Sequence, residues 1–285
     1  MRLKPNTFDD IRKAVHDLCG IVIAEDKHYL VVSRLEPILK RNGLHSYESL
    51  VQGLKQPNSL RLQEQIIEAI TTKETSFNRD GHPFEELRRS ILPRLASRLL
   101  ERRPATRLVN PRSRIWCTAV ATGQEAYSVA MAVSDFLSSR PGLGLTLDDF
   151  PILATDISPG ALATAREGRY SASELSRGTS VEQRERFFRQ DERGWVVIPS
   201  LRRGIEFRRL NLVQPLPNLG TFDLILCRNL LIYLDVDTRR RLCRGLHLAL
   251  NPDGILMIGA AESIYGVTDA FSAERLGNTV VHRKQ

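Results

Sequence analysis

Two polar residues interrupt the strand-like run of FDLILCRNLLIYL, at residues 222–234. The first half is typical of a buried strand, and Arg228 and Asn229 follow it before apolar residues resume and include Tyr233. A guanidinium and an amide can satisfy a carboxylate or unpaired backbone groups. Because ligands of open α/β sheets lie beyond the carboxyl ends of the strands, this interruption indicates a binding site. Arg228 taken alone would more often form a structural ion pair, so the evidence lies in polar residues at several strand ends.

Small residues follow another predicted strand, in AVATGQEAYS. Gly123 and its small neighbours let the backbone approach a ligand closely. A helix that begins near Gln124 offers unpaired N–H groups and a positive dipole to an anion. The single glycine is a poor match to the GxGxxG pattern of nicotinamide binders, so a plain strand–helix turn remains the alternative.

Asp156 ends the segment ILATD, where doubly wound nucleotide binders place an acid on a ribose diol. It follows Gly123 by 33 residues. The alternative is an N-cap for the next helix, a role that Ser158 could fill instead. Together these features favour an adenosyl ligand. Asn211 and Leu212 follow a further β segment, and an amide beside an aliphatic residue suits the edge and face of an adenine.

The strand ends require a framework of alternating strands and helices. From about residue 112, RIWCTAV precedes ATGQEAYSVAMAVSDFL, FPILATD precedes ISPGALATAREG, and FDLILCRN precedes VDTRRRLCRGLHLAL, before Gly254 opens GILMIG. This alternation predicts a parallel sheet covered on both faces, the doubly wound α/β class. It lapses between residues 168 and 207, where GWVVIP and GIEFRRL predict a small β insertion or hairpin.

The first hundred residues show helical periodicity and no clear strand. Gly43 is expected to end one helix, and Ser46 can cap the next. The apolar faces are formed by Phe8, Ile11, Val15 and Leu18, by Leu35, Ile38 and Leu39, and by Leu62, Ile66, Ile67 and Ile70. We therefore predict an α-helical domain at 1–84, a basic linker helix at 85–111 and an α/β domain at 112–285.

The composition, with 42% hydrophobic and 26% charged residues among 285, is that of an ordinary globular protein. No apolar run approaches 18 residues and no signal-like segment begins the sequence, so we expect a cytoplasmic protein. The four cysteines show neither paired spacing nor a neighbouring histidine, so no disulfide framework and no metal site is predicted.

The net charge of +8 indicates an anionic partner. Much of the excess lies at residues 88–107, where arginines alternate with apolar residues. This pattern predicts an amphipathic helix whose basic face is either a binding surface or a solvated face that joins two domains.

The chain resembles the CheR-type chemoreceptor glutamate O-methyltransferases. The resemblance runs through TTKETSFNRDGHPFEEL, WCTAVATGQEAYSVAMAV, ILATDISPGALATAREGRY, LNLVQPLP, FDLILCRNLLIYL and LNPDGILMIGAAES, in the order and spacing of the family. It covers nearly the whole chain, as far as Glu262. It implies a Rossmann-like S-adenosylmethionine-dependent methyltransferase domain with an N-terminal all-helical domain and a small antiparallel β insertion at about 187–207.

The resemblance also implies the reaction. S-adenosylmethionine would methylate glutamate side chains of a chemoreceptor, giving glutamate methyl ester and S-adenosylhomocysteine, for adaptation in chemotaxis or related signalling. Arg79 and Tyr233 would face the methyl-transfer centre. The implied cofactor contacts are Thr75, Arg79, Glu125, Asp156, Asn211, Leu212, Arg228 and Asn229.

The chemistry of the reaction agrees with these residue types. A glutamate carboxylate is ionised at neutral pH, since its unperturbed pKa is about 4.3, so transfer needs placement and a dry site rather than a strong base. Arg79 could orient the carboxylate by a bidentate pair, and Tyr233 could hydrogen-bond it or help fix the methyl group. Glu125 suits the ammonium group of the cofactor, or is an ordinary acid in a first helical turn.

Three residues depart from the family pattern. Lys73 stands where asparagine is usual, Asn78 where a second phenylalanine is usual, and Gln124 where glutamate is usual. An added cation weakens sulfonium binding unless it points away or pairs with a carboxylate, and Asn78 removes apolar cover beside Arg79. These departures motivate an alternative hypothesis, a regulatory or scaffold protein that binds the cofactor or its product with little or no turnover.

The implied protein partner is the cytoplasmic helical methylation region of a chemoreceptor, whose acidity would explain the positive charge. Residues 188–206 form a compact segment that resembles family members which do not bind a receptor tail peptide. We expect no nucleic-acid substrate, because the sequence lacks both an NPPY-type tetrad and a nucleophilic Pro-Cys motif. We also expect a monomer that is not embedded in a membrane.

Overall fold

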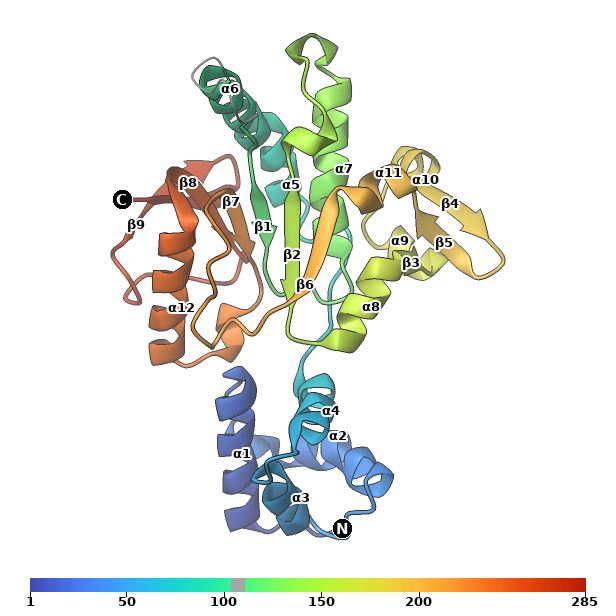
Figure 1. Cartoon of the computed structure of the whole chain (residues 1–285), viewed down its shortest axis with the longest axis vertical. Coiled ribbons are helices and arrows are strands. Elements are labelled where there is room, and N and C mark those ends of the chain that lie inside the picture. Colours follow the sequence, from blue (N-terminus) through green and yellow to red (C-terminus); the bar gives the residue numbers. More distant parts are fainter. Residues whose placement is uncertain (104–110) are drawn as a thin grey trace.

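Helices at the amino terminus form a bundle with its own core. The computed structural model describes residues 1–103 and 111–285 (Figure 1). The bundle consists of α1 (Pro5–Cys19), α2 (His28–Arg41), α3 (Tyr47–Leu54) and α4 (Leu60–Ile70), with a short turn, η1 (Glu25–Lys27). Phe8, Leu35 and Ile66 all lie in one buried cluster, so the predicted apolar faces are confirmed.

Local signals end and begin these helices where the sequence predicted. Helix α2 ends at Arg41, and Gly43 lies two residues beyond it with a positive φ of 64°. The Ser46 hydroxyl accepts a hydrogen bond from the Ser49 N–H at 3.1 Å, which caps the start of α3.

The predicted basic helix packs into the core of the α/β domain. It runs through α5 (His82–Glu86), a π-helical turn η2 (Leu87–Ile91) and α6 (Leu92–Arg102). Leu95 and Leu99 are fully buried, whereas Arg94 pairs with a carboxylate of another element. Two more ion pairs join Arg102, at the end of α6, to Asp223, and Arg103, directly after α6, to Asp149. Its basic face therefore supplies structural ion pairs; residues 104–110 of the predicted 85–111 segment lie outside the described residues.

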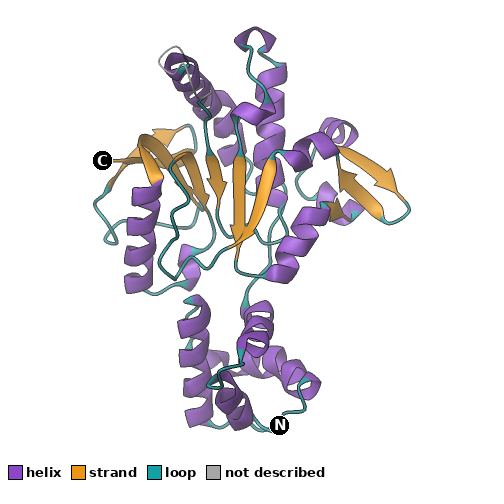
Figure 2. Ribbon diagram, in the orientation of Figure 1, coloured by secondary structure: helices purple, strands orange, loops and turns teal. Residues whose placement is uncertain are grey.

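Within the described residues, seven strands form one mixed sheet in the order β6-β2-β1-β7-β8-β10-β9 (Figure 2). Its strands are β1 (Ile115–Cys117), β2 (Ile152–Asp156), β6 (Ile205–Arg209), β7 (Phe222–Cys227), β8 (Leu250–Ile258), β9 (Phe271–Leu276) and β10 (Thr279–Lys284). The five strands from β6 to β8 are parallel, and β10 and β9 add an antiparallel end.

Both faces of the sheet are buried. Ile115 and its register partner Leu224 face one cluster, and Trp116 and its partner Ile225 face another. The covering helices include α7 (Gln124–Ser138), α8 (Pro159–Glu167) and α12 (Val236–Ala249). This alternation confirms the predicted doubly wound α/β class, because strands buried on both faces read as continuous apolar runs.

A second, antiparallel sheet of order β3-β5-β4 is inserted after α8. Its elements are β3 (Arg169–Tyr170), α9 (Ala172–Ser176), α10 (Val181–Phe187), β4 (Phe188–Asp191) and β5 (Gly194–Val197), and α11 (Pro199–Arg203) returns the chain to the large sheet. The prediction that GIEFRRL belongs to the insertion is wrong. Residues Ile205–Arg209 form the edge strand β6, which pairs in parallel with β2.

The large sheet lies with the carboxyl ends of its parallel strands toward the bundle. The carboxyl ends of β2 and β6 face the helices α1 and α4 (Figure 1). Short turns complete this domain, η3 (Pro141–Leu143), η4 (Leu147–Asp149) and η5 (Leu231–Tyr233). No helix in the described ranges is long and apolar enough to span a membrane.

Candidate active site

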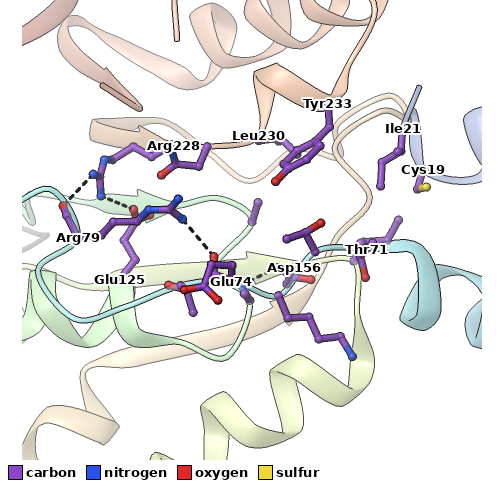
Figure 3. A pocket seen from close by; sticks show the side chains of 17 residues that line it. Cys19, Ile21, Thr71, Glu74, Arg79, Glu125, Asp156, Arg228, Leu230 and Tyr233 are labelled. Carbon is purple, nitrogen blue, oxygen red and sulfur yellow. Dashed lines mark hydrogen bonds and ion pairs between the residues drawn. The ribbon is translucent and has the colours of Figure 1, made fainter. Parts of the chain in front are cut away.

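A cavity of about 310 Å³ lies between the carboxyl ends of β1, β2 and β7 and the amino-terminal bundle (Figure 3). Seven of the predicted site residues line it, namely Thr75, Arg79, Glu125, Asp156, Arg228, Asn229 and Tyr233. Figure 3 shows Arg79 and Glu125 at one end, with Tyr233 across the cavity from Asp156. The structure therefore brings together residues from four separate segments of the chain.

The turn between β1 and α7 holds its backbone open to the cavity. Ala119 and Ala121 line the cavity and have positive φ angles of 50° and 49°. Gly123 follows at 96°, and a Cβ atom there would lie 2.8 Å from the Ala165 side chain. Small residues are needed at this turn because larger side chains are strained there.

Asp156 presents a buried carboxylate whose two oxygens are held by backbone groups. Oδ2 accepts from the Ala121 N–H and Oδ1 from the Ser158 N–H, each at 2.8 Å. Ser158 caps α8, because its hydroxyl accepts from the Ala161 N–H at 3.0 Å. Burial raises the pKa of Asp156, against which the backbone hydrogen bonds act. The capping role thus falls to Ser158, and Asp156 retains lone pairs for a ligand.

Arg228 is the centre of a buried ion network at the other end. Its fully buried guanidinium donates to Glu125 at 2.9 Å, to Asp80 at 2.7 Å and to the Arg79 carbonyl at 3.0 Å. Burial raises the pKa of Glu125, while the Arg228 charge lowers it. Arg228 therefore forms structural ion pairs, the alternative given for it above, and it also lines the cavity. Asp80 was missed by the sequence reasoning, although it belongs to the ETSFNRD segment.

Arg79 extends into the cavity from the loop that follows the bundle. One of its Nη atoms donates to the Glu74 carbonyl at 3.1 Å. No carboxylate within the described residues pairs with this guanidinium, so it can bind an anion that enters the cavity.

The turn after β7 is held in a strained conformation by a carboxylate. Asn229 has a φ of 58°, and its N–H donates to Glu262 at 2.7 Å. Glu262 also accepts from the Gly259 N–H at 2.7 Å, which ties together the ends of β7 and β8. Glu262 was not predicted as a site residue, because no local pattern in the sequence indicates this role.

The bundle contributes residues that sequence reasoning did not place in the site. Cys19 and Ile21 line the cavity, and the Val22 N–H donates to the Tyr233 carbonyl at 2.9 Å. Burial raises the pKa of Cys19 to about 11, so its thiol is protonated at neutral pH. Cys19 and Ile21 therefore share the cavity lining with Tyr233, and such small or apolar residues carry no chemical signal in the sequence.

Two predicted contacts lie away from the cavity lining. The Asn211 amide donates to the Leu18 carbonyl at 2.8 Å, and Leu212 packs into a buried cluster. Their contact with a cofactor stays a prediction.

Lys73 lines the cavity but is paired. Its ammonium contacts the Glu68 carboxylate, which also accepts from the Ser158 hydroxyl at 2.6 Å and the Gly160 N–H at 2.7 Å. The added cation thus has a carboxylate partner, the condition under which it is compatible with a sulfonium. The added positive charge of Lys73 was the main reason to consider a protein without turnover, and its pairing with Glu68 removes that reason.

Two family models match the chain. Residues 6–71 match the CheR methyltransferase all-alpha domain, and residues 73–280 match the CheR methyltransferase SAM binding domain. The chain belongs to the CheR methyltransferase family. It is therefore an S-adenosylmethionine-dependent methyltransferase.

Relatives of this family match almost end to end. Chemotaxis protein methyltransferase Cher2 of Pseudomonas putida is 34% identical, with 97% of each chain covered. Chemotaxis protein methyltransferase 1 of Pseudomonas aeruginosa is 35% identical, again with 97% of each chain covered. The Vibrio cholerae protein of the same name is 35% identical, with 97% of this chain and 96% of the relative covered.

The polar groups that line the cavity fit the cofactor of this family. The Asp156 carboxylate can accept hydrogen bonds from a ribose diol, and the open β1–α7 turn lets a ligand approach the backbone. Glu125 places a negative charge where an ammonium group can approach. The volume is at the lower end of the range for small-molecule sites, which is about 300–1,000 Å³.

Proposed function

We propose that this protein methylates glutamate side chains of chemoreceptors for adaptation in chemotaxis or related signalling. The observation that carries the proposal is one cavity in which Arg79 and Tyr233 lie beside the cofactor-type residues Asp156 and Glu125. Family membership and the chemotaxis methyltransferases named above support it.

The cofactor residues act by binding and orientation. Asp156 would accept from the ribose hydroxyls and Glu125 from the ammonium group, while Arg228 keeps Glu125 in place. Thr75 and Asn229 line the same cavity and would contact the cofactor. When bound, S-adenosylmethionine supplies an electrophilic methyl group on its sulfonium.

The acceptor residues position a carboxylate that is already ionised. Arg79 would hold the glutamate by charge-assisted hydrogen bonds, and the Tyr233 hydroxyl would donate to it. Cys19 and Ile21 line this side of the cavity and would give it an apolar wall. Because anion and sulfonium lose charge as the methyl group moves, a dry site with fixed donors favours transfer.

The substrate segment is the helical methylation region of a chemoreceptor, and the net charge of +8 favours an acidic surface. The inserted sheet has short strands, which supports methylation without a receptor tail peptide. We also propose that the enzyme is a cytoplasmic monomer that acts on protein and not on nucleic acid.

A labelling experiment tests this function. Membranes with a chemoreceptor signalling domain are incubated with the enzyme and methyl-labelled S-adenosylmethionine. We expect base-labile methyl esters on the receptor, lost in Arg79→Ala and retained when the receptor tail is deleted. Absence of label on every receptor of the source organism would overturn the proposal, whereas loss of label on tail deletion would overturn only its tail-independent part.

A further inference from the structure

Asn78 lies immediately before Arg79 and connects its loop to the inserted sheet. Its side-chain amide donates to the Gly178 carbonyl at 2.7 Å and to the Gln183 side-chain oxygen at 3.1 Å. Both partners lie in the insertion, 100 and 105 residues further along the chain. Its backbone N–H donates to the buried Ser128 hydroxyl of α7 at 2.9 Å.

The backbone conformation of this loop suits asparagine. Asn78 has a φ of 46°, in the left-handed region, and Asp80 follows at 69°. The Asn78 carbonyl accepts from the Gly81 N–H at 2.8 Å, which closes the turn around Arg79. Asparagine tolerates this conformation better than most residues with a Cβ atom, whereas phenylalanine would be strained there.

The contact between the loop and the insertion is close. Phe77 is fully buried, with its ring edge-on to Tyr170 at 5.0 Å and to Phe188 at 5.4 Å between centroids. A Cβ atom on Gly178 would lie 1.8 Å from the Phe77 carbonyl oxygen. The two segments therefore cannot slide past each other without breaking these contacts.

We propose that Asn78 is a positioning residue that holds Arg79 in the geometry required for methyl transfer. The amide fixes the loop on one side to the insertion, while Arg228 holds the Arg79 carbonyl on the other at 3.0 Å. The residue that departs from the family pattern thus replaces apolar cover with directed hydrogen bonds. Because Asn78 acts through Arg79, the proposal depends on the proposed role of Arg79 in the reaction.

Two substitutions separate the effect of the Asn78 side-chain hydrogen bonds from that of its backbone conformation. Asn78→Gly removes the amide and keeps the left-handed φ accessible, and Asn78→Asp keeps the shape but cannot donate to the Gly178 carbonyl. We expect each to lower kcat for receptor methylation about tenfold or more, since small misplacements of catalytic groups have effects of this size. Binding of S-adenosylhomocysteine, followed by calorimetry, should change less than kcat does.

A matched control is Asn218→Gly. Asn218 also makes a local hydrogen bond, since its side-chain oxygen accepts from the Gly220 N–H at 3.0 Å, but it lies in an exposed loop outside the cavity lining. We expect its kcat to stay within about twofold of the native value, as for most surface substitutions.

A double-mutant cycle with Arg79→Lys decides whether Asn78 acts through Arg79. We expect Asn78→Gly to lower kcat strongly in the native background and little in the Arg79→Lys background. An equal loss in both backgrounds, or no loss in either Asn78 variant, would overturn the positioning role. If Arg79→Lys alone leaves kcat unchanged, the proposed function of Arg79 fails, and this result is distinct from an additive cycle.

Discussion

The two ends of the cavity hold a buried carboxylate in different ways. Asp156 accepts hydrogen bonds from the backbone N–H groups of Ala121 and Ser158, which lie in turns next to β2. Glu125 is held by the Arg228 guanidinium, which Asp80 shares. Backbone donors remain when neighbouring side chains change, whereas each member of an ion network depends on the others. Substitutions that keep the backbone conformation should therefore leave Asp156 in place, whereas loss of any one charge should disturb the whole Arg228 network.

Removal of Arg228 should have the largest effect. Arg228→Met leaves Glu125 and Asp80 without their buried cation, and breaking a buried pair in this way costs about 3–5 kcal/mol. Urea unfolding should show this loss in the free energy of unfolding, together with loss of methylation. Addition of Glu125→Gln should restore part of the stability, because it removes the unpaired charge.

Arg244→Met is the matched control for that prediction. Arg244 is exposed on α12, and no ion pair joins it to another described residue. We expect its free energy of unfolding to lie within about 0.5 kcal/mol of the native value. If the two arginine variants unfold alike, the ion network does not stabilise this end of the cavity.

Asp156→Asn should weaken the cofactor more than the fold. The amide keeps one oxygen for a backbone N–H group but places a donor where a second acceptor is needed. Loss of hydrogen bonds to a charged group costs about 1.5–3 kcal/mol, or roughly 10- to 150-fold in affinity for S-adenosylhomocysteine. Calorimetry measures this affinity, and a value equal to that of the native protein would contradict the role of Asp156.

Ser158→Ala, at the same end of the cavity, should lower the stability of the fold more than the affinity for the cofactor product. The hydroxyl caps α8, and loss of an N-cap costs about 1 kcal/mol of stability. The Ser158 N–H, which binds Asp156, is unchanged by the substitution. Urea unfolding should therefore show the loss, while affinity for S-adenosylhomocysteine should change less than in Asp156→Asn.

The same contrast explains how far the sequence could predict the site. Asp156 was found because a strand end and a helix start are local patterns, and Ser158 resolved the choice between cap and ligand. Arg228 was found as a strand-end residue, but its partners Glu125 and Asp80 lie 103 and 148 residues away. Only the fold brings such charges together.

The errors in the fold have a similar origin. The apolar strand–helix alternation predicted the doubly wound sheet, since its period is local. The segment Ile205–Arg209 has the length and pattern of a hairpin strand, and only its pairing with β2 identifies it as an edge of the large sheet. Cys19 and Ile21 reach the cavity through the packing of the bundle, for which apolar residues give no signal.

The pH dependence of stability should show the smallest of these effects. Burial raises the pKa of Asp156 above its usual 3.8, so the folded state holds the proton more tightly than the unfolded chain does. The contribution of this group is therefore fully present below the unfolded pKa and is lost as the pH rises through the folded pKa. Asp156→Asn does not titrate. The free energy of unfolding of the native protein minus that of Asp156→Asn should fall as the pH rises above 3.8, measured by urea unfolding at a series of pH values. A difference that grows with pH would mean that the backbone donors outweigh burial at Asp156.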